Sequence, residues 1–363
     1  MIGFDFSPLL QMLAMAVVLG GLPLAWVWRQ GRGAPHRERL RLLTVLAMTL
    51  TFELILFGAF TRLTDSGLGC PDWPGCYGHA SPLGAHGDIQ QAQTAMPTGP
   101  VTHGKAWVEM LHRYFASAVG FLILTTAVLH TRWRQEAGMP SPAWSWLSLV
   151  WVLVQGLFGA LTVTMKLFPA IVTLHLLLAL GLLMLLGWQA QRLGERREPM
   201  TPGLRAGLVA VLAVVLVQVA LGGWVSTNYA VLACDDFPTC QGGWWPAMDF
   251  ARGFTLWREL GLHHDGSVLP FEALVAIHWT HRLFAAVATA AVLLLAWRLH
   301  RAGLATWSRR LLLILLWQLL SGLSNVVLDW PLAAALAHTG GAAALLLCLT
   351  LLRARAQRLT PEA

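Results

Sequence analysis

The sequence carries the same set of candidate metal ligands twice. In each half, two cysteines separated by five residues are followed by two histidines in separate apolar segments. In the first half these residues are Cys70, Cys76, His112 and His175. In the second half they are Cys234, Cys240, His281 and His338. Thiolates and imidazoles bind metals, so the duplication predicts two related sites in two related half-proteins.

The four histidines all fall inside apolar segments, at similar depth. A histidine within a membrane helix is rare and usually faces the interior of a bundle. Two imidazoles that face each other across a bundle can hold a haem. A single histidine would more simply form an interhelical hydrogen bond, but two matched pairs favour haem. A structural zinc site is disfavoured, because its ligands are closer in sequence and usually include cysteine.

The residue three positions before the first histidine of each pair differs between the halves. It is Glu109 in the first half and His278 in the second, and residues three apart share one helical face. A carboxylate inside a span is costly and tends to be functional; beside a haem it can accept a proton, orient water or stabilise a cation. The alternative is a salt bridge from Glu109 to Arg113 or Arg62.

The composition is that of an integral membrane protein. The chain has 363 residues, of which 56% are hydrophobic and 12% charged, and its mean hydropathy is +0.60. A soluble protein would carry about a quarter charged residues. A helix needs about 20 apolar residues to cross a bilayer. We expect nine spans, at 9–28, 40–61, 107–130, 144–165, 170–191, 204–226, 272–299, 309–329 and 332–353.

Arginines are concentrated in alternate connections between these spans. The clusters lie at 29–41, 132–134, 192–205, 298–310 and 353–358. By the positive-inside rule these connections face the cytoplasm, so the net charge of +7 reflects orientation and does not indicate a nucleic-acid partner. The connections 62–106 and 227–271 then face outward. The N-terminus is predicted outside and the C-terminus inside.

Three nearly equal offsets align the two halves. An offset of 164 aligns the cysteine segments, together with Gly58 and Gly222; offsets of 169 and 163 align the first and second histidines. We therefore expect an all-α protein with two parallel four-helix halves, related by an axis along the membrane normal. The predicted parts are an extra N-terminal helix with a basic linker (1–39), the N-terminal half (40–191), a cytoplasmic linker (192–203), the C-terminal half (204–353) and a basic tail (354–363).

The paired cysteines fall in the outward loops, in an oxidising compartment where disulfides persist. A Pro-containing turn between them favours local pairing of Cys70 with Cys76 and of Cys234 with Cys240. A shared metal site, cross-loop disulfides and a redox role for the first pair stay open. Cys348, in the last span, is predicted to be an inert apolar residue.

Several of these stretches closely resemble the heme A synthase family. The resemblance rests on residues 58–78, Glu109-x-x-His112-Arg113, the loop 234–246, His278-x-x-His281-Arg282, and the late-span His175 and His338. It covers about 40–353, and its motifs are long and specific. The extra first helix departs from the eight spans usual in that family.

The resemblance implies an oxidoreductase that converts heme O to heme A for terminal cytochrome oxidases. The C8 methyl group of heme O becomes a formyl group, with oxygen supplied by water. The implied iron ligands are His281 and His338 for a heme b cofactor and His112 and His175 for the heme O substrate. Glu109 takes the position regarded as catalytic.

The resemblance also implies a bacterial inner-membrane location. The implied partners are heme O synthase, cytochrome oxidase assembly factors and an unidentified electron acceptor. Arg62, Arg113 and Arg282, near the outer ends of spans, would suit haem propionates.

Two other functions fit a duplicated haem binder. One is a non-catalytic di-haem cytochrome b that exchanges electrons with quinone, and the other is a haem transporter. The contrast between Glu109 and His278 favours the enzyme, because a simple electron relay needs no acid in one site only.

Overall fold

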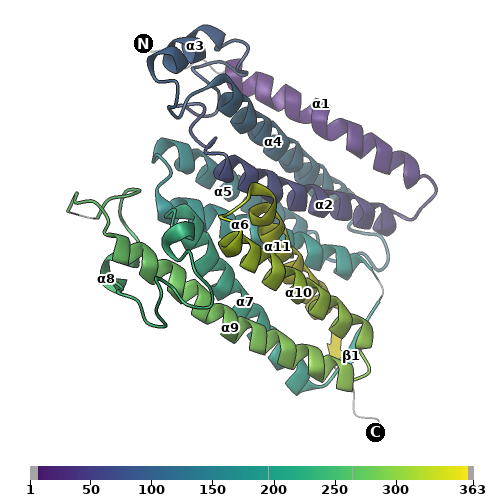
Figure 1. Cartoon of the computed structure of the whole chain (residues 1–363). Coiled ribbons are helices and arrows are strands. Elements are labelled where there is room, and N and C mark those ends of the chain that lie inside the picture. Colours follow the sequence, from purple (N-terminus) through teal and green to yellow (C-terminus); the bar gives the residue numbers. More distant parts are fainter. Residues whose placement is uncertain (1–6, 195, 264, 359–363) are drawn as a thin grey trace. The chain divides into compact units, whose positions relative to one another are not determined.

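The computed structural model describes residues 7–194, 196–263 and 265–358, and helices dominate it (Figure 1). Within this part of the chain, nine helices are long and apolar enough to cross a membrane. They are α1 (Ser7–Gln30), α2 (His36–Leu63), α4 (His103–Arg132), α5 (Ala143–Thr164), α6 (Pro169–Leu193), α7 (Pro202–Thr227), α9 (Phe271–Arg301), α10 (Ala305–Val327) and α11 (Leu332–Arg355). The prediction of an all-α, nine-span membrane protein is confirmed. Parts of the predicted N-terminal region (1–6) and tail (359–363) lie outside the described residues.

The remaining elements are short. Helices α3 (His86–Ala95), η1 (Val231–Ala233) and α8 (Phe250–Gly253) lie in the two long connections. Strands β1 (Glu198–Met200) and β2 (Ala356–Arg358) pair in parallel. The sequence gives no signal for these strands, because three residues are too few to show an alternating pattern.

The helices form two compact units. The first comprises Met1–Leu167 and Gly181–Gly194, and the second Phe168–Leu180 and Glu195–Ala363. Helix α6 contributes to both units, so residues 168–180 belong to the second one. The predicted halves 40–191 and 204–353, and the symmetry axis between them, stay predictions.

In the first unit, α4 is the central helix. It packs against α1, α2, α3 and α5. The predicted extra helix α1 is part of this packing: a Cβ on Gly20 would lie 2.7 Å from the ring of Phe121 in α4. Gly20 therefore lets the two helices approach closely, as small residues do in membrane bundles.

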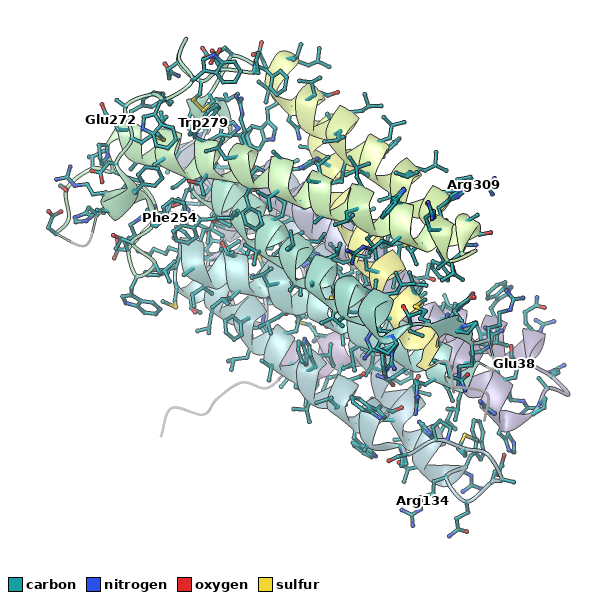
Figure 2. All side chains as sticks on the ribbon, turned by 90° about the horizontal axis from the view of Figure 1, so that it is seen from below. Glu38, Arg134, Phe254, Glu272, Trp279 and Arg309 are labelled. Atoms are coloured by element: carbon teal, nitrogen blue, oxygen red, sulfur yellow. A yellow bond between two sulfur atoms is a disulfide. The ribbon has the colours of Figure 1, made fainter. Side chains whose placement is uncertain are left out.

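The second unit contains a closed ring of four helices. Helix α7 packs against α9, α9 against α10, α10 against α11, and α11 against α7. In Figure 2, Glu272 and Trp279 mark the end of this unit near the long loop, and Arg309 marks the opposite end. This is the kind of bundle whose interior can hold a cofactor.

Unusual backbone conformations recur at the offset of the sequence repeat. Tyr77 and Gln241, which are 164 residues apart, have φ of 49° and 54°. Lys166 and Asp329, which are 163 apart, have φ of 50° and 54°. Positive φ is uncommon for residues other than glycine. Positive-φ residues therefore recur at two of the offsets that align the halves of the sequence.

Candidate functional site

Both cysteine segments fold into the same disulfide-closed turn. Cys70 is bonded to Cys76 and Cys234 to Cys240, with Cα–Cα distances of 4.9 and 4.8 Å. The predicted local pairing is confirmed. In each turn the second cysteine exchanges two backbone hydrogen bonds with the residue three positions later. Cys348 is free and buried, as predicted.

An aspartate stabilises each turn from within. Asp72 accepts a hydrogen bond from the amide of Tyr77 at 2.6 Å, and Asp236 accepts one from the amide of Gly242 at 3.1 Å. Asp236 also accepts from the hydroxyl of Thr239, which holds the pKa of Asp236 below its usual value. These bonds satisfy backbone donors that the turn leaves without a partner.

An arginine from the following helix holds each turn in place. Arg113 in α4 donates to the carbonyls of Asp72 (3.0 Å), Pro74 (3.1 Å) and Gly75 (2.5 Å). Arg282 in α9 donates to the carbonyls of Asp236 (2.7 Å), Thr239 (2.9 Å) and Cys234 (2.7 Å). The planar guanidinium, with five donors, suits such a set of carbonyls. We call each of these sets an arginine clamp.

The first clamp includes Glu109. This carboxylate is buried, with 3% of its surface exposed. It forms an ion pair with Arg113 and accepts a hydrogen bond from the amide of Cys70 at 2.8 Å. The salt bridge to Arg113, which was the structural alternative for Glu109, is therefore present. Arg62 instead pairs with Asp65 at 3.3 Å.

The second clamp has a neutral side chain at the same place. His278 is 5% exposed, and its Nε2 accepts a hydrogen bond from Nε of Arg282 at 3.2 Å. The second loop carries an acid that the first loop lacks, because Asp235 stands where the first loop has Pro71. The acid of the first clamp lies on the helix, whereas the extra acid of the second lies in the loop.

Two of the predicted haem ligands come together in the second unit. His281 in α9 and His338 in α11 are partly buried and lie near enough to each other for an electrostatic interaction between the two rings. Gln218 in α7 contacts Nδ1 of His281 at 3.1 Å, and Ser321 in α10 contacts Nδ1 of His338 at 3.2 Å. The Ser321 hydroxyl can accept a hydrogen bond from Nδ1 of His338, as in histidines that bind a metal through the other nitrogen. The Gln218 amide nitrogen is a donor, and it also lies 3.5 Å from Nε2 of His281.

A glycine on the neighbouring helix lies against three of the four histidine rings. A Cβ placed on Gly58 would lie 3.1 Å from Cε1 of His112. A Cβ on Gly222 would lie 2.9 Å from Cε1 of His281, and one on Gly322 would lie 3.0 Å from Cε1 of His338. At these glycine positions, any larger residue would crowd the neighbouring imidazole ring. His112 also makes an edge-on contact with Phe57, with ring centroids 5.8 Å apart.

The pairing of His112 with His175 stays a prediction. His112 lies in the first unit and His175 in the segment that belongs to the second. The sequence prediction also missed the supporting residues Gln218 and Ser321. A polar residue inside an apolar span is the signal that could have found Gln218, whose counterpart in the first half is Leu54.

Comparison with known proteins shows which family the chain belongs to. The model of the COX15/CtaA family, described as cytochrome oxidase assembly protein, matches residues 41–350. The heme A synthase of Shewanella oneidensis is 39% identical over 317 residues, covering 85% of this chain and 95% of that protein. The heme A synthase of a Bradyrhizobium species is 29% identical, covering 85% of this chain and 88% of its own. The chain belongs to the heme A synthase (COX15/CtaA) family of cytochrome oxidase assembly proteins.

Proposed function

We propose that this membrane protein is a heme A synthase, which oxidises the C8 methyl group of heme O to the formyl group of heme A. The observation that carries the proposal is the 39% identity to a heme A synthase over 85% of the chain. With water as the oxygen source, one methyl group and one water yield one formyl group, four protons and four electrons. The protein must therefore hold the substrate, accept protons and pass electrons to an acceptor.

His281 and His338 are the proposed ligands of a heme b cofactor. Their proximity within the ring α7–α9–α10–α11 and the contact of the Ser321 hydroxyl with Nδ1 of His338 fit a bis-histidine site. Gly222 and Gly322 leave space beside the two imidazoles. A bound haem would supply one-electron redox chemistry there. Ser321 would keep the ring of His338 oriented.

His112 and His175 are the proposed ligands of the substrate heme O. The proposal for His112 is supported by Gly58, which leaves room beside its ring in the same way as Gly222 does for His281. For His175 it is supported by the matching position of His338 in the repeat.

Glu109 is the proposed catalytic carboxylate. Its Oε1 contacts Arg113 and its Oε2 accepts from the amide of Cys70. Each carboxylate oxygen has two lone pairs, so Glu109 can also orient a water molecule or receive a proton while it stays in the clamp. Arg113 would hold the carboxylate in a fixed position while that proton is transferred.

The proposed location is the bacterial inner membrane, with the cysteine loops and the N-terminus outside and the C-terminus in the cytoplasm. The alternating arginine clusters support this orientation. The chemistry requires a supplier of heme O, a receiver of heme A and an electron acceptor. Heme O synthase and cytochrome oxidase assembly factors are the proposed partners for the first two.

Haem extraction with mass analysis, from the wild type and four histidine variants, tests the assignment. We expect His281→Ala and His338→Ala to lose heme B. We expect His112→Ala and His175→Ala to keep heme B but to form no heme A. If the purified protein carries only heme B and its deletion leaves cellular heme A unchanged, the synthase assignment is wrong and an electron-carrying cytochrome b takes its place.

A further inference from the structure

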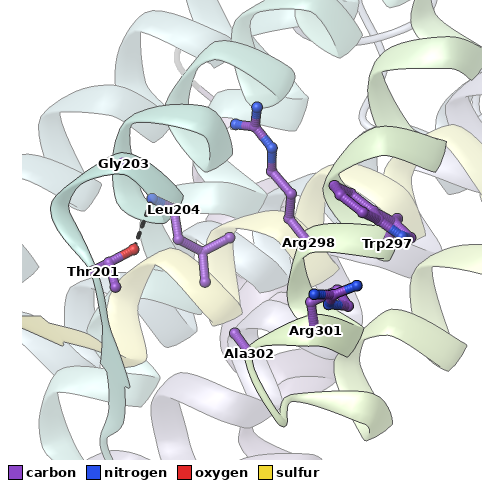
Figure 3. A pocket seen from close by; sticks show the side chains of 7 residues that line it. All are labelled: Thr201, Gly203, Leu204, Trp297, Arg298, Arg301 and Ala302. Atoms are coloured by element: carbon purple, nitrogen blue, oxygen red, sulfur yellow. Dashed lines mark hydrogen bonds between the residues drawn. The ribbon is translucent and has the colours of Figure 1, made fainter.

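An open pocket lies at the end of the second unit that is far from the cysteine loop. It has a volume of about 450 Å³, within the range of small-ligand sites. Its lining residues are Thr201, Gly203, Leu204, Trp297, Arg298, Arg301 and Ala302 (Figure 3). The pocket joins the start of α7 to the end of α9, whereas the cysteine loop joins the end of α7 to the start of α9.

Two guanidinium groups give the pocket its charge. Among the described residues, neither Arg298 nor Arg301 forms an ion pair with a carboxylate. Arg301 lies over the ring of Trp297, 5.8 Å from its centroid, and Figure 3 shows Arg298 extending separately from the same helix. Arginines without a carboxylate partner are suited to a phosphate, which they bind through paired hydrogen bonds.

The start of α7 adds a weaker attraction for an anion. Thr201 caps the helix by accepting from the amide of Leu204 at 3.3 Å, and Pro202 has no amide proton. A Cβ on Gly203 would meet no atom within 4 Å, so the space beside this residue is open. The positive end of the helix dipole therefore faces the same open space as the two arginines.

The face of α9 that carries the two arginines continues beyond the pocket as an apolar surface. Leu294, Trp297, Arg298 and Arg301 are spaced at i, i+3, i+4 and i+7, so they share one face of α9. Leu294 is 49% exposed and Trp297 58% exposed. Exposed apolar residues on a spanning helix face the acyl chains, and tryptophan favours the level of the headgroups. A ligand with a phosphate and an acyl chain would match both parts of this face.

We propose that this pocket binds the phosphate of an anionic phospholipid headgroup, with an acyl chain lying along Leu294 and Trp297. Basic pockets between spanning helices are known to bind anionic headgroups. A free phosphate shares the charged part of this chemistry but would gain nothing from the apolar surface. The proposal involves no residue of the proposed haem sites, so its outcome does not depend on that of the proposed function.

Native mass spectrometry of the purified full-length protein tests the proposal. Phosphatidylglycerol, phosphatidylethanolamine with the same chains, and inorganic phosphate are titrated separately. We expect phosphatidylglycerol to bind more tightly than the other two. Each arginine near the membrane surface contributes about 1 kcal/mol, so R298Q should weaken phosphatidylglycerol binding about five-fold and R298Q/R301Q about 25-fold.

The matched control is R309Q, which removes an exposed arginine from α10 at the same end of the unit but outside the pocket. It should change binding less than two-fold. Gly203→Glu is a second test, because its side chain enters open space and an acid in the first turn favours the helix. It should weaken binding of the anionic lipid without lowering the unfolding temperature.

Three results would overturn the proposal. The first is equal binding of phosphatidylglycerol and phosphatidylethanolamine. The second is an equal loss of binding in R309Q and R298Q/R301Q, which would indicate general surface charge. The third is inorganic phosphate that binds as tightly as phosphatidylglycerol with the same dependence on Arg298 and Arg301, which would identify a free-phosphate site.

Discussion

The two arginine clamps hold equivalent turns with different side chains beneath them. In the first unit Arg113 is paired with the buried acid Glu109. In the second unit Arg282 donates to the neutral His278. Both arginines bind three carbonyls of their loop, two of which are at matching positions. The disulfide-closed turn therefore forms with or without a carboxylate on the helix.

This difference bears on the role of Glu109. Because the second turn keeps its shape with His278, an acid at this position is not required to build the turn. The extra acid of the second loop, Asp235, lies outside the helix, where the first loop has Pro71. The first unit instead places its acid one turn from Arg113 and on the same face as His112. The position of Glu109 is therefore explained better by the chemistry proposed for the first unit than by a structural requirement of the turn.

The largest expected effect comes from Glu109→Gln. The amide still offers an oxygen to Cys70 but removes the charge. Because positioned acids and bases contribute about 10²–10⁴-fold, we expect heme A formation to fall at least about 100-fold, measured by haem extraction from cells. Heme B content should change little, and the unfolding temperature should fall less than in Arg113→Met, because Arg113 keeps its three loop carbonyls.

The matched variant at the other clamp is His278→Gln, which should leave most heme A formation intact. If Glu109→Gln lowers heme B content or thermal stability as much as it lowers heme A, then Glu109 is a structural residue and the contrast between the clamps has no catalytic meaning.

The next effect concerns stability. Arg113→Met leaves the buried Glu109 without its ionic partner, which typically costs about 3–5 kcal/mol. Arg282→Met removes hydrogen bonds to three carbonyls and to His278, at about 1–3 kcal/mol, and the nearby acids Asp235 and Asp236 lie in the loop and not in the spanning helix. The free energy of unfolding in mixed micelles should therefore fall further for Arg113→Met.

Adding Glu109→Gln to Arg113→Met should restore part of the loss, because the uncompensated charge is then gone. Equal losses for the two single variants, or no recovery in the double variant, would show that the ion pair adds nothing to the first clamp.

The smallest effect is expected at the glycines beside the histidines. Gly222→Ala places a Cβ 2.9 Å from His281, and Gly58→Ala places one 3.1 Å from His112. Such overpacking typically costs about 1–3 kcal/mol, and the ring must shift. We expect Gly222→Ala to alter the absorption spectrum of bound heme B, and Gly58→Ala to leave that spectrum unchanged while it lowers heme A formation.

Gly156→Ala in α5, where a Cβ meets no atom within 4 Å, is the control for the added methyl group. A spectrum that changes equally in all three variants would mean that the glycines do not position the histidines.

The spans and disulfides were predictable because their signals are local. A run of about 20 apolar residues specifies a spanning helix, and two cysteines around a tight turn readily meet. The clamps were not predictable, because the binding of Arg113 to three carbonyls some 40 residues earlier depends on how the loop folds back over α4. The same holds for Gln218 and Ser321, whose partners lie on other helices.

The pairing of β1 with β2 has a consequence for the topology of the second unit. One strand immediately precedes α7 and the other immediately follows α11, so the chain enters and leaves the four-helix ring at one point. A segment whose ends are adjacent can be permuted circularly or inserted as a module. The four-helix ring is therefore suited to circular permutation. A short linker could join its present ends, and new ends could be opened in another loop without moving a helix.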